Sequence, residues 1–98
     1  MDKLVYLNTL YDCYKSLFTE KQQMYFELYY WENLSLGEIA NNNNVSRNAI
    51  HNQLKIMEEK LLELEEKLKI NEKKEKITKI LEDKIDEKTL DEIKELLS

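Results

Sequence analysis

The chain has 98 residues with no proline and a single glycine, and its 15 basic and 20 acidic side chains give a net charge of −5. This length is enough for one domain with a modest core and too short for two domains. Abundant Leu, Ile, Lys and Glu predict an almost entirely helical, all-α protein. No apolar run approaches the ~18 residues of a membrane span and no signal peptide opens the chain, so we expect no membrane insertion. One cysteine, Cys13, excludes an internal disulfide and is typical of the reducing cytoplasm.

Charge is distributed unevenly along the chain. Basic and acidic residues number 3 and 5 in residues 1–34, 2 and 1 in residues 35–55, and 10 and 14 in residues 56–98. Tight non-specific binding of nucleic acid needs a broad basic surface, which this balance does not provide. Any contact with a duplex is therefore expected to be local and weak.

Two amphipathic helices are predicted in the first third of the chain. The first spans about Asp2 to Leu17, and its apolar residues recur at alternating spacings of three and four: Leu4, Leu7, Tyr11, Tyr14 and Phe18. The second spans about Glu20 to Glu32, after a capping box formed by Thr19 and Gln22. We expect this second helix to bury Met24, Leu28 and Trp31.

The next stretch, residues 35–55, has the pattern of a helix-turn-helix. Ser35 and Glu38 form a second capping box, and Asn44 is the expected left-handed residue of the turn. Ser46 then caps a second helix, whose buried side begins with Ala49, Ile50 and Leu54. In this motif the exposed side chains at the start of the second helix face a duplex.

The apolar spacing of this second helix continues well past the motif. Its seam has spacings of 4, 3, 4, 3 and 4 and consists of Ile50, Leu54, Met57, Leu61, Leu64 and Leu68. One helix from about Ser46 to Ile70 is predicted, roughly 37 Å long. A leucine seam of this length needs cover, either from the N-terminal stripe or from a second copy. We predict a homodimer whose partner-helix seam is Leu54, Met57, Leu61, Leu64 and Leu68.

The domain organisation predicted is a helix-turn-helix domain in residues 1–70 and a helical extension in residues 71–98. The extension begins with a polar hinge at Asn71–Lys76, helical or frayed, and ends in a short helix capped by Thr89 or by Asp86. It packs on the long helix or on a partner chain in one interpretation. In the other it is a free arm for docking a protein.

Catalysis finds little support in the residues. Cys13 and His51 are the only soft metal donors, which is too few for a zinc site, and no Gly-rich loop could hold a nucleotide phosphate. Cys13 is expected to be a small buried hydrophobe. The carboxylates alternate with lysines and are expected to lie on helix exteriors. We therefore expect no enzyme, no cofactor, no metal and no small-molecule substrate.

The sequence resembles region 4 of bacterial sigma factors in two stretches, F-T-E-K-Q-Q-M-Y-F-E-L-Y-Y-W-E-N-L-S-L-G-E-I-A and V-S-R-N-A-I-H-N-Q-L-K. It is most similar to the small stand-alone relatives of that region, the YlxM family, over about residues 2–70. The resemblance implies a helix-turn-helix fold with an extra N-terminal helix and a DNA-binding, regulatory role. It also implies a link to the signal recognition particle pathway, because the genes of the family neighbour those of the targeting GTPases.

The resemblance implies a set of residues on the second helix that face a duplex: Ser46, Arg47, Asn48, His51, Asn52 and Lys55. Arg47 would contact a guanine edge or a phosphate, Asn48 an adenine edge, and Ser46 and Lys55 phosphates. Alternatively, Arg47 is merely exposed. The chain departs from the family pattern at Asn44, which replaces a glycine, and Glu58 and Glu59 bring negative charge toward the phosphates.

Three functional hypotheses follow. In the first, the protein is an accessory factor of the signal recognition particle pathway that contacts RNA or protein through the helix-turn-helix. In the second, it is a sequence-specific transcriptional regulator. In the third, it is a dimeric protein-interaction module that binds no nucleic acid.

Overall fold

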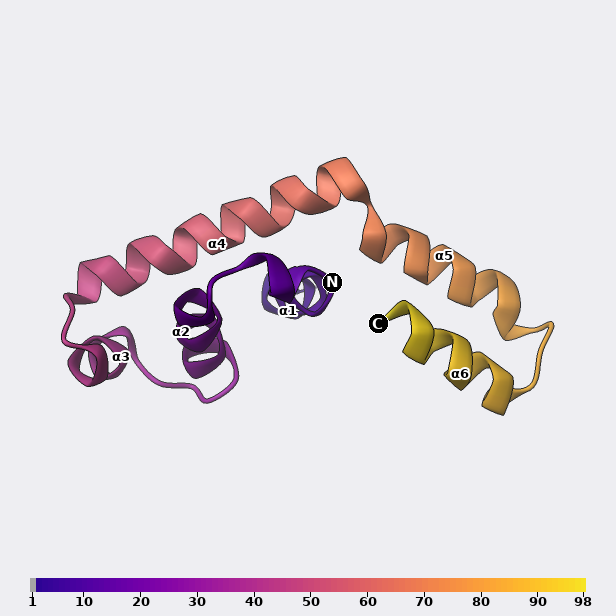
Figure 1. Ribbon diagram of the computed structural model, residues 1–98, viewed down its shortest axis with the longest axis horizontal. Coiled ribbons are helices and arrows are strands. Elements are labelled where there is room, and N and C mark those ends of the chain that lie inside the picture. Colours follow the sequence, from indigo (N-terminus) through magenta and orange to yellow (C-terminus); the bar gives the residue numbers. More distant parts are fainter. Residues whose placement is uncertain (1) are drawn as a thin grey trace.

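The computed structural model describes residues 2–98, and over this range it is all-helical, which confirms the predicted fold class (Figure 1). Its elements in chain order are α1 (Lys3–Tyr14), the 3₁₀ turn η1 (Lys15–Leu17), α2 (Glu20–Tyr30), α3 (Leu36–Asn43), α4 (Arg47–Leu68), α5 (Ile70–Glu82) and α6 (Glu87–Leu97). Within residues 2–98, none of these helices is long and apolar enough to span a membrane.

The capping boxes predicted at the starts of α2 and α3 are present. The Gln22 backbone N–H donates to Thr19 Oγ1 at 3.1 Å, and the Thr19 N–H donates to the Gln22 side chain at 3.0 Å. Ser35 and Glu38 form the same pair of bonds at 3.1 and 3.0 Å. The Ser35 backbone donor holds the pKa of the Glu38 carboxyl below its ordinary value. These bonds satisfy N–H groups that a helix start leaves unpaired, so the starts of α2 and α3 follow from local sequence.

The burial expected for α2 is wrong at two positions. Met24 is 39% exposed and Trp31 is 46% exposed, whereas Tyr25 and Phe26 are buried instead. Apolar side chains occur on every side of this helix, and its Tyr25–Phe26 side is the one that meets the core. In the first helix the expected stripe is buried except at Leu4, which is 45% exposed.

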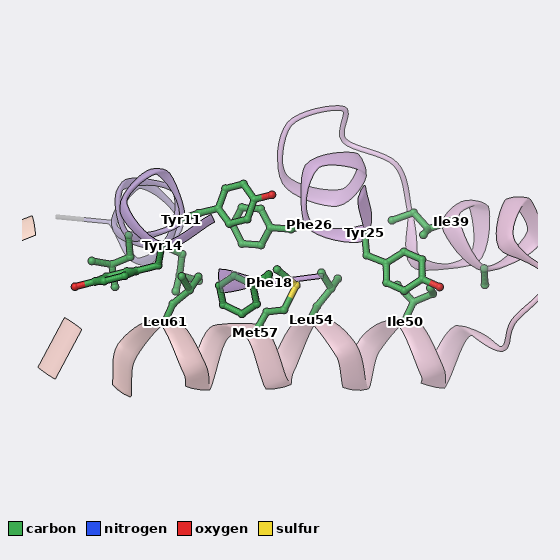
Figure 2. Packing of buried hydrophobic residues seen from close by; sticks show 13 residues of the cluster. Tyr11, Tyr14, Phe18, Tyr25, Phe26, Ile39, Ile50, Leu54, Met57 and Leu61 are labelled. Atoms are coloured by element: carbon green, nitrogen blue, oxygen red, sulfur yellow. The ribbon is translucent and has the colours of Figure 1, made fainter. Parts of the chain in front are cut away.

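Helix α4 is the support on which the core is built. Figure 2 shows its buried side chains facing those of α1, α2 and α3, with Met57 and Leu61 beneath the aromatic rings. Both of these α4 residues are 0% exposed. The rings of Tyr11 and Phe26 stack with their centroids 4.0 Å apart. The seam is therefore covered within the chain as far as Leu61, by the N-terminal stripe at Met57 and Leu61 and by α2 and α3 nearer the start of α4.

The far end of α4 differs from the prediction. Leu64 is half-buried and Leu68 is 45% exposed. The helix ends at Leu68 and not at Ile70, because Lys69 adopts a left-handed conformation with φ 55° and ψ 33°. Residues 71–76, expected to be a helical or frayed hinge, lie inside α5 and are helical.

A buried hydrogen-bond network fixes the corner between α4 and α5. Glu65 is buried, with 8% of its surface exposed. Its carboxylate accepts hydrogen bonds from the Tyr14 hydroxyl at 2.7 Å and from the Asn71 and Glu72 backbone N–H groups, both at 3.1 Å. The Tyr14 hydroxyl in turn accepts from the Ile70 N–H at 3.2 Å. The first three N–H groups of α5 are thus capped by α1 and α4, although Lys69 makes no side-chain cap. Glu65 was wrongly expected to be an exterior carboxylate.

The two C-terminal helices form a hairpin that extends away from the α1–α3 bundle (Figure 1). Asp86 caps α6, since its Oδ1 accepts from the Thr89 N–H at 3.3 Å, which decides between the two predicted caps. Leu90 is buried against α5, but Ile80 is 60% exposed and Leu96 is 84% exposed. The hairpin therefore leaves much of its aliphatic surface uncovered.

We predict that Tyr14→Phe lowers the free energy of unfolding by about 1–3 kcal/mol at pH 7, because the buried Glu65 loses a donor and the Ile70 N–H loses its acceptor. Burial, and then the bond to Glu65, raise the pKa of Tyr14 from 10.0 to about 12. The unfolded chain ionises first, so the stabilisation by Tyr14 is complete below pH 10 and is lost as pH rises toward 12.

Urea denaturation from pH 7 to 11.5 checks this prediction. The difference between the native protein and Tyr14→Phe should shrink above pH 10. Tyr29→Phe is the control, because the Tyr29 hydroxyl makes no protein hydrogen bond in the structure of residues 2–98. An equal loss for both variants would contradict a specific role for the Tyr14 hydroxyl.

Candidate nucleic-acid interface

The turn between α3 and α4 has the geometry that the sequence predicts. Asn44 is left-handed with φ 55° and ψ 40°, and its N–H donates to the Ala40 carbonyl. The following residue, Val45, also donates to that carbonyl at 3.1 Å. Ile39 and Ala40 are buried. Because the side chain of Ala40 is small, α3 can approach α4 closely. The helix-turn-helix is therefore formed as expected.

Ser46 begins the second helix of the motif. Its Oγ accepts from the Ala49 N–H at 3.0 Å, and α4 starts at the next residue, Arg47. A serine hydroxyl that accepts one bond still has a proton to donate, so capping leaves Ser46 able to contact a phosphate. The positive end of the helix dipole adds a modest attraction for anions at this point.

The residues implied for duplex contact lie together on the exposed side of α4. All of them are exposed to solvent: Ser46, Arg47, Asn48, His51, Asn52 and Lys55. On the opposite side Ile50 is 0% and Leu54 6% exposed, and they anchor the helix in the core. In residues 2–98, neither Arg47 nor Lys55 takes part in any of the four ion pairs. Apart from Ser46, which caps the helix, these polar and cationic side chains make no hydrogen bond or ion pair with other groups of residues 2–98.

The carboxylates next to this face are less repulsive than the sequence suggested. Glu58, which was expected to oppose phosphates, pairs with Lys3 from the start of α1 at 2.6 Å. Lys3 and Glu58 lie with His51 and Lys55 around a shallow hollow of roughly 360 Å³ beside the exposed face. Lys3 could not be assigned to this region from the sequence, because only the packing of α1 across α4 brings the start of α1 next to Glu58. Glu59 remains exposed and unfavourable.

Helix α3, the left-handed turn at Asn44 and the exposed start of α4 form a helix-turn-helix, which defines the class of protein. A family model described as "Putative helix-turn-helix protein, YlxM / p13 like", the UPF0122 family, matches residues 1–97. The chain belongs to this family, as the sequence resemblance indicated.

Curated relatives agree with this assignment. A UPF0122 protein of Halalkalibacterium halodurans is 48% identical over 82 residues, which cover 84% of this chain and 75% of the relative. One from Bacillus velezensis is 44% identical over 86 residues, covering 84% and 78%. A third, from Desulforamulus reducens, is 56% identical over 62 residues, covering 63% of this chain and 53% of the relative.

We predict that Ser46→Ala lowers the free energy of unfolding by about 1 kcal/mol, because the Ala49 N–H loses its acceptor. The matched control is Asn52→Ala, an exposed position farther along α4 that is expected to change stability by less than about 0.5 kcal/mol. Urea denaturation measures both. A Ser46→Ala variant as stable as the native protein would show that the cap contributes nothing.

Proposed function

We propose that this protein is a regulatory DNA-binding protein that reads a B-form duplex with the first three turns of α4. The observation that supports this most strongly is the exposed row that begins with Arg47, without ion-pair partners among residues 2–98, on a helix whose other side is held in the core. Arg47 is the only arginine in the chain. A guanidinium gives bidentate contacts to guanine or phosphate that lysine cannot reproduce.

The shape of the motif favours DNA over duplex RNA. A recognition helix fits the major groove of B-DNA, about 12 Å wide, whereas the major groove of A-form RNA is too deep and narrow for side chains to read. The link to the signal recognition particle pathway rests on the family resemblance, and the RNA of that particle is therefore the competing ligand in the test. Either ligand suits a cytoplasmic protein.

Binding through this face should be weak. Residues 35–55 offer two cations, Arg47 and Lys55, against one carboxylate, Glu38. Each phosphate that a cation neutralises contributes about −0.9 to the slope of log affinity against log salt, so one α4 face should give a slope near −2.

Arg47→Ala tests the proposal. We expect it to weaken binding to duplex DNA from the protein's own promoter about tenfold, a loss of about 1.4 kcal/mol. If Arg47 contacts a phosphate, the salt slope falls by about one; if it contacts a guanine, preference for the native site falls instead. Fluorescence anisotropy across a salt series measures both.

Lys60→Ala is the matched control, because Lys60 is an exposed cation on α4 beyond the proposed face. Equal losses for the two variants would contradict the proposed site. Stronger binding to the signal recognition particle RNA would select the targeting role. No binding to either nucleic acid at low salt would leave the protein-interaction module.

We also propose that the protein is a homodimer joined through the α5–α6 hairpin and not through the predicted seam. Leu54, Met57 and Leu61 of that seam are buried within the chain and leave no surface for a second copy. Nine aliphatic residues lie in residues 70–97, and Leu90 alone among them is buried. Two such hairpins can cover each other as a four-helix bundle. Residues 69–98 hold 8 basic and 9 acidic groups, so two copies do not repel strongly.

Ile80→Glu should therefore dissociate the dimer. Sedimentation at micromolar concentration is expected to show two chains for the native protein and a single 11.9 kDa chain for the variant. Ile56→Glu, at a half-exposed position of α4, is the control and should remain dimeric. If the native protein sediments only as a single chain, the proposed dimer is wrong.

A further inference from the structure

The outer face of α2 forms an open groove, lined by three apolar and five polar residues, that the proposed DNA face and dimer do not use. Met24 and Trp31 are 39% and 46% exposed, and Leu28 between them is half-buried. These residues are spaced by four and three, so they lie on one side of the helix. The groove is open to solvent and has a volume of roughly 390 Å³. Exposed Trp and Met gathered in one groove are typical of a surface that binds another protein.

The groove is held in shape before any partner arrives. Gln23 Nε2 donates to the carbonyls of Lys15 and Phe18 at 3.1 and 3.0 Å, which ties α2 to η1. The Trp31 indole N–H donates to Asn8 Oδ1 at 2.8 Å, which fixes its ring against α1. A preformed groove avoids the entropy cost of ordering side chains on binding, so even a modest apolar contact contributes to affinity.

The rim of the groove is acidic. Its charged lining consists of Glu20, Glu27, Glu32 and Lys15. Glu27 pairs with Lys15 at 3.3 Å and accepts from the Tyr11 hydroxyl at 2.6 Å. In residues 2–98, Glu20 and Glu32 take part in none of the ion pairs. Glu20 is the first residue of α2 and Glu32 lies just beyond its end, so they leave negative charge at the two ends of the groove.

We infer that this groove docks a basic amphipathic helix from a partner protein. An apolar residue of that helix packs between Met24 and Trp31, and its Lys or Arg side chains pair with Glu20 and Glu32. A second copy of this chain is a poor occupant, because two acidic rims would face each other across the symmetry axis. Because α2 turns its Tyr25–Phe26 side to the core, the groove stays open while α4 contacts DNA. The protein would then join a partner to a duplex.

The test uses Trp31 as its reporter, since it is the only tryptophan in the chain. The probe is a synthetic 18-residue amphipathic helix of Leu and Lys, titrated into the full-length protein at physiological salt. We expect the Trp31 emission to shift to shorter wavelength and to saturate. A matched peptide with Glu in place of Lys should give no shift.

Variants then locate the site. Met24→Ser should weaken peptide binding about tenfold, and Glu20→Gln with Glu32→Gln should weaken it and reduce its salt dependence. Ile56→Ser, a half-exposed apolar residue on α4, is the control and should bind as the native protein does. All these positions are on the surface, and circular dichroism confirms that each variant is folded.

Three results would overturn the inference. The basic peptide could bind without changing Trp31 emission, or bind Met24→Ser as tightly as the native protein, and either outcome places it elsewhere. A shift that grows with protein concentration alone would mean that a second copy covers the groove. None of these results depends on DNA binding, so this inference and the proposed function fail separately.

Discussion

The contact of α1 across α4 is the constraint on which the rest of the structure depends. It covers Met57 and Leu61, and it brings the Tyr14 hydroxyl to the buried Glu65. A carboxylate held away from water is costly unless it is fully hydrogen-bonded, and here a hydroxyl and two backbone N–H groups supply the donors. The two backbone donors are in place only if α5 begins where it does. The packing of the N-terminal helix therefore sets the direction of the C-terminal hairpin.

In this arrangement α4 has three parts with different structural roles. Its first turns, from Arg47, are exposed on one side and held by Ile50 on the other. Its middle is core, and its last turn carries the corner at Glu65. A side chain that must reach a base edge needs a rigid support, and a helix anchored along its length in the core provides it. The proposed DNA face is rigid for this reason, although its small positive charge makes its binding to DNA weak.

The elements that could be predicted from the sequence are those fixed by neighbouring residues. Capping boxes and the left-handed Asn44 involve bonds within a few positions, and the exposed side of α4 follows from its periodicity. The inward face of α2 could not be predicted, because apolar residues surround that helix. The break near residue 70 was predicted from Asn71, but its position at Lys69 and the left-handed conformation there have no signal in that residue. It is fixed by Tyr14, which is 56 residues away from Ile70 along the chain, together with Glu65 in the last turn of α4.

The position of the hairpin limits how a dimer could meet DNA. The molecule is 52 Å long, and the start of α4 and the hairpin lie toward opposite ends of it (Figure 1). Helix-turn-helix dimers that read adjacent half-sites place their recognition helices one DNA turn apart, about 34–36 Å. Two chains joined at their hairpins hold those helices farther apart than this, unless the chains fold back along each other. A hairpin-linked dimer therefore suits widely spaced half-sites or two separate duplexes, and the gain from its second weak contact depends on that spacing.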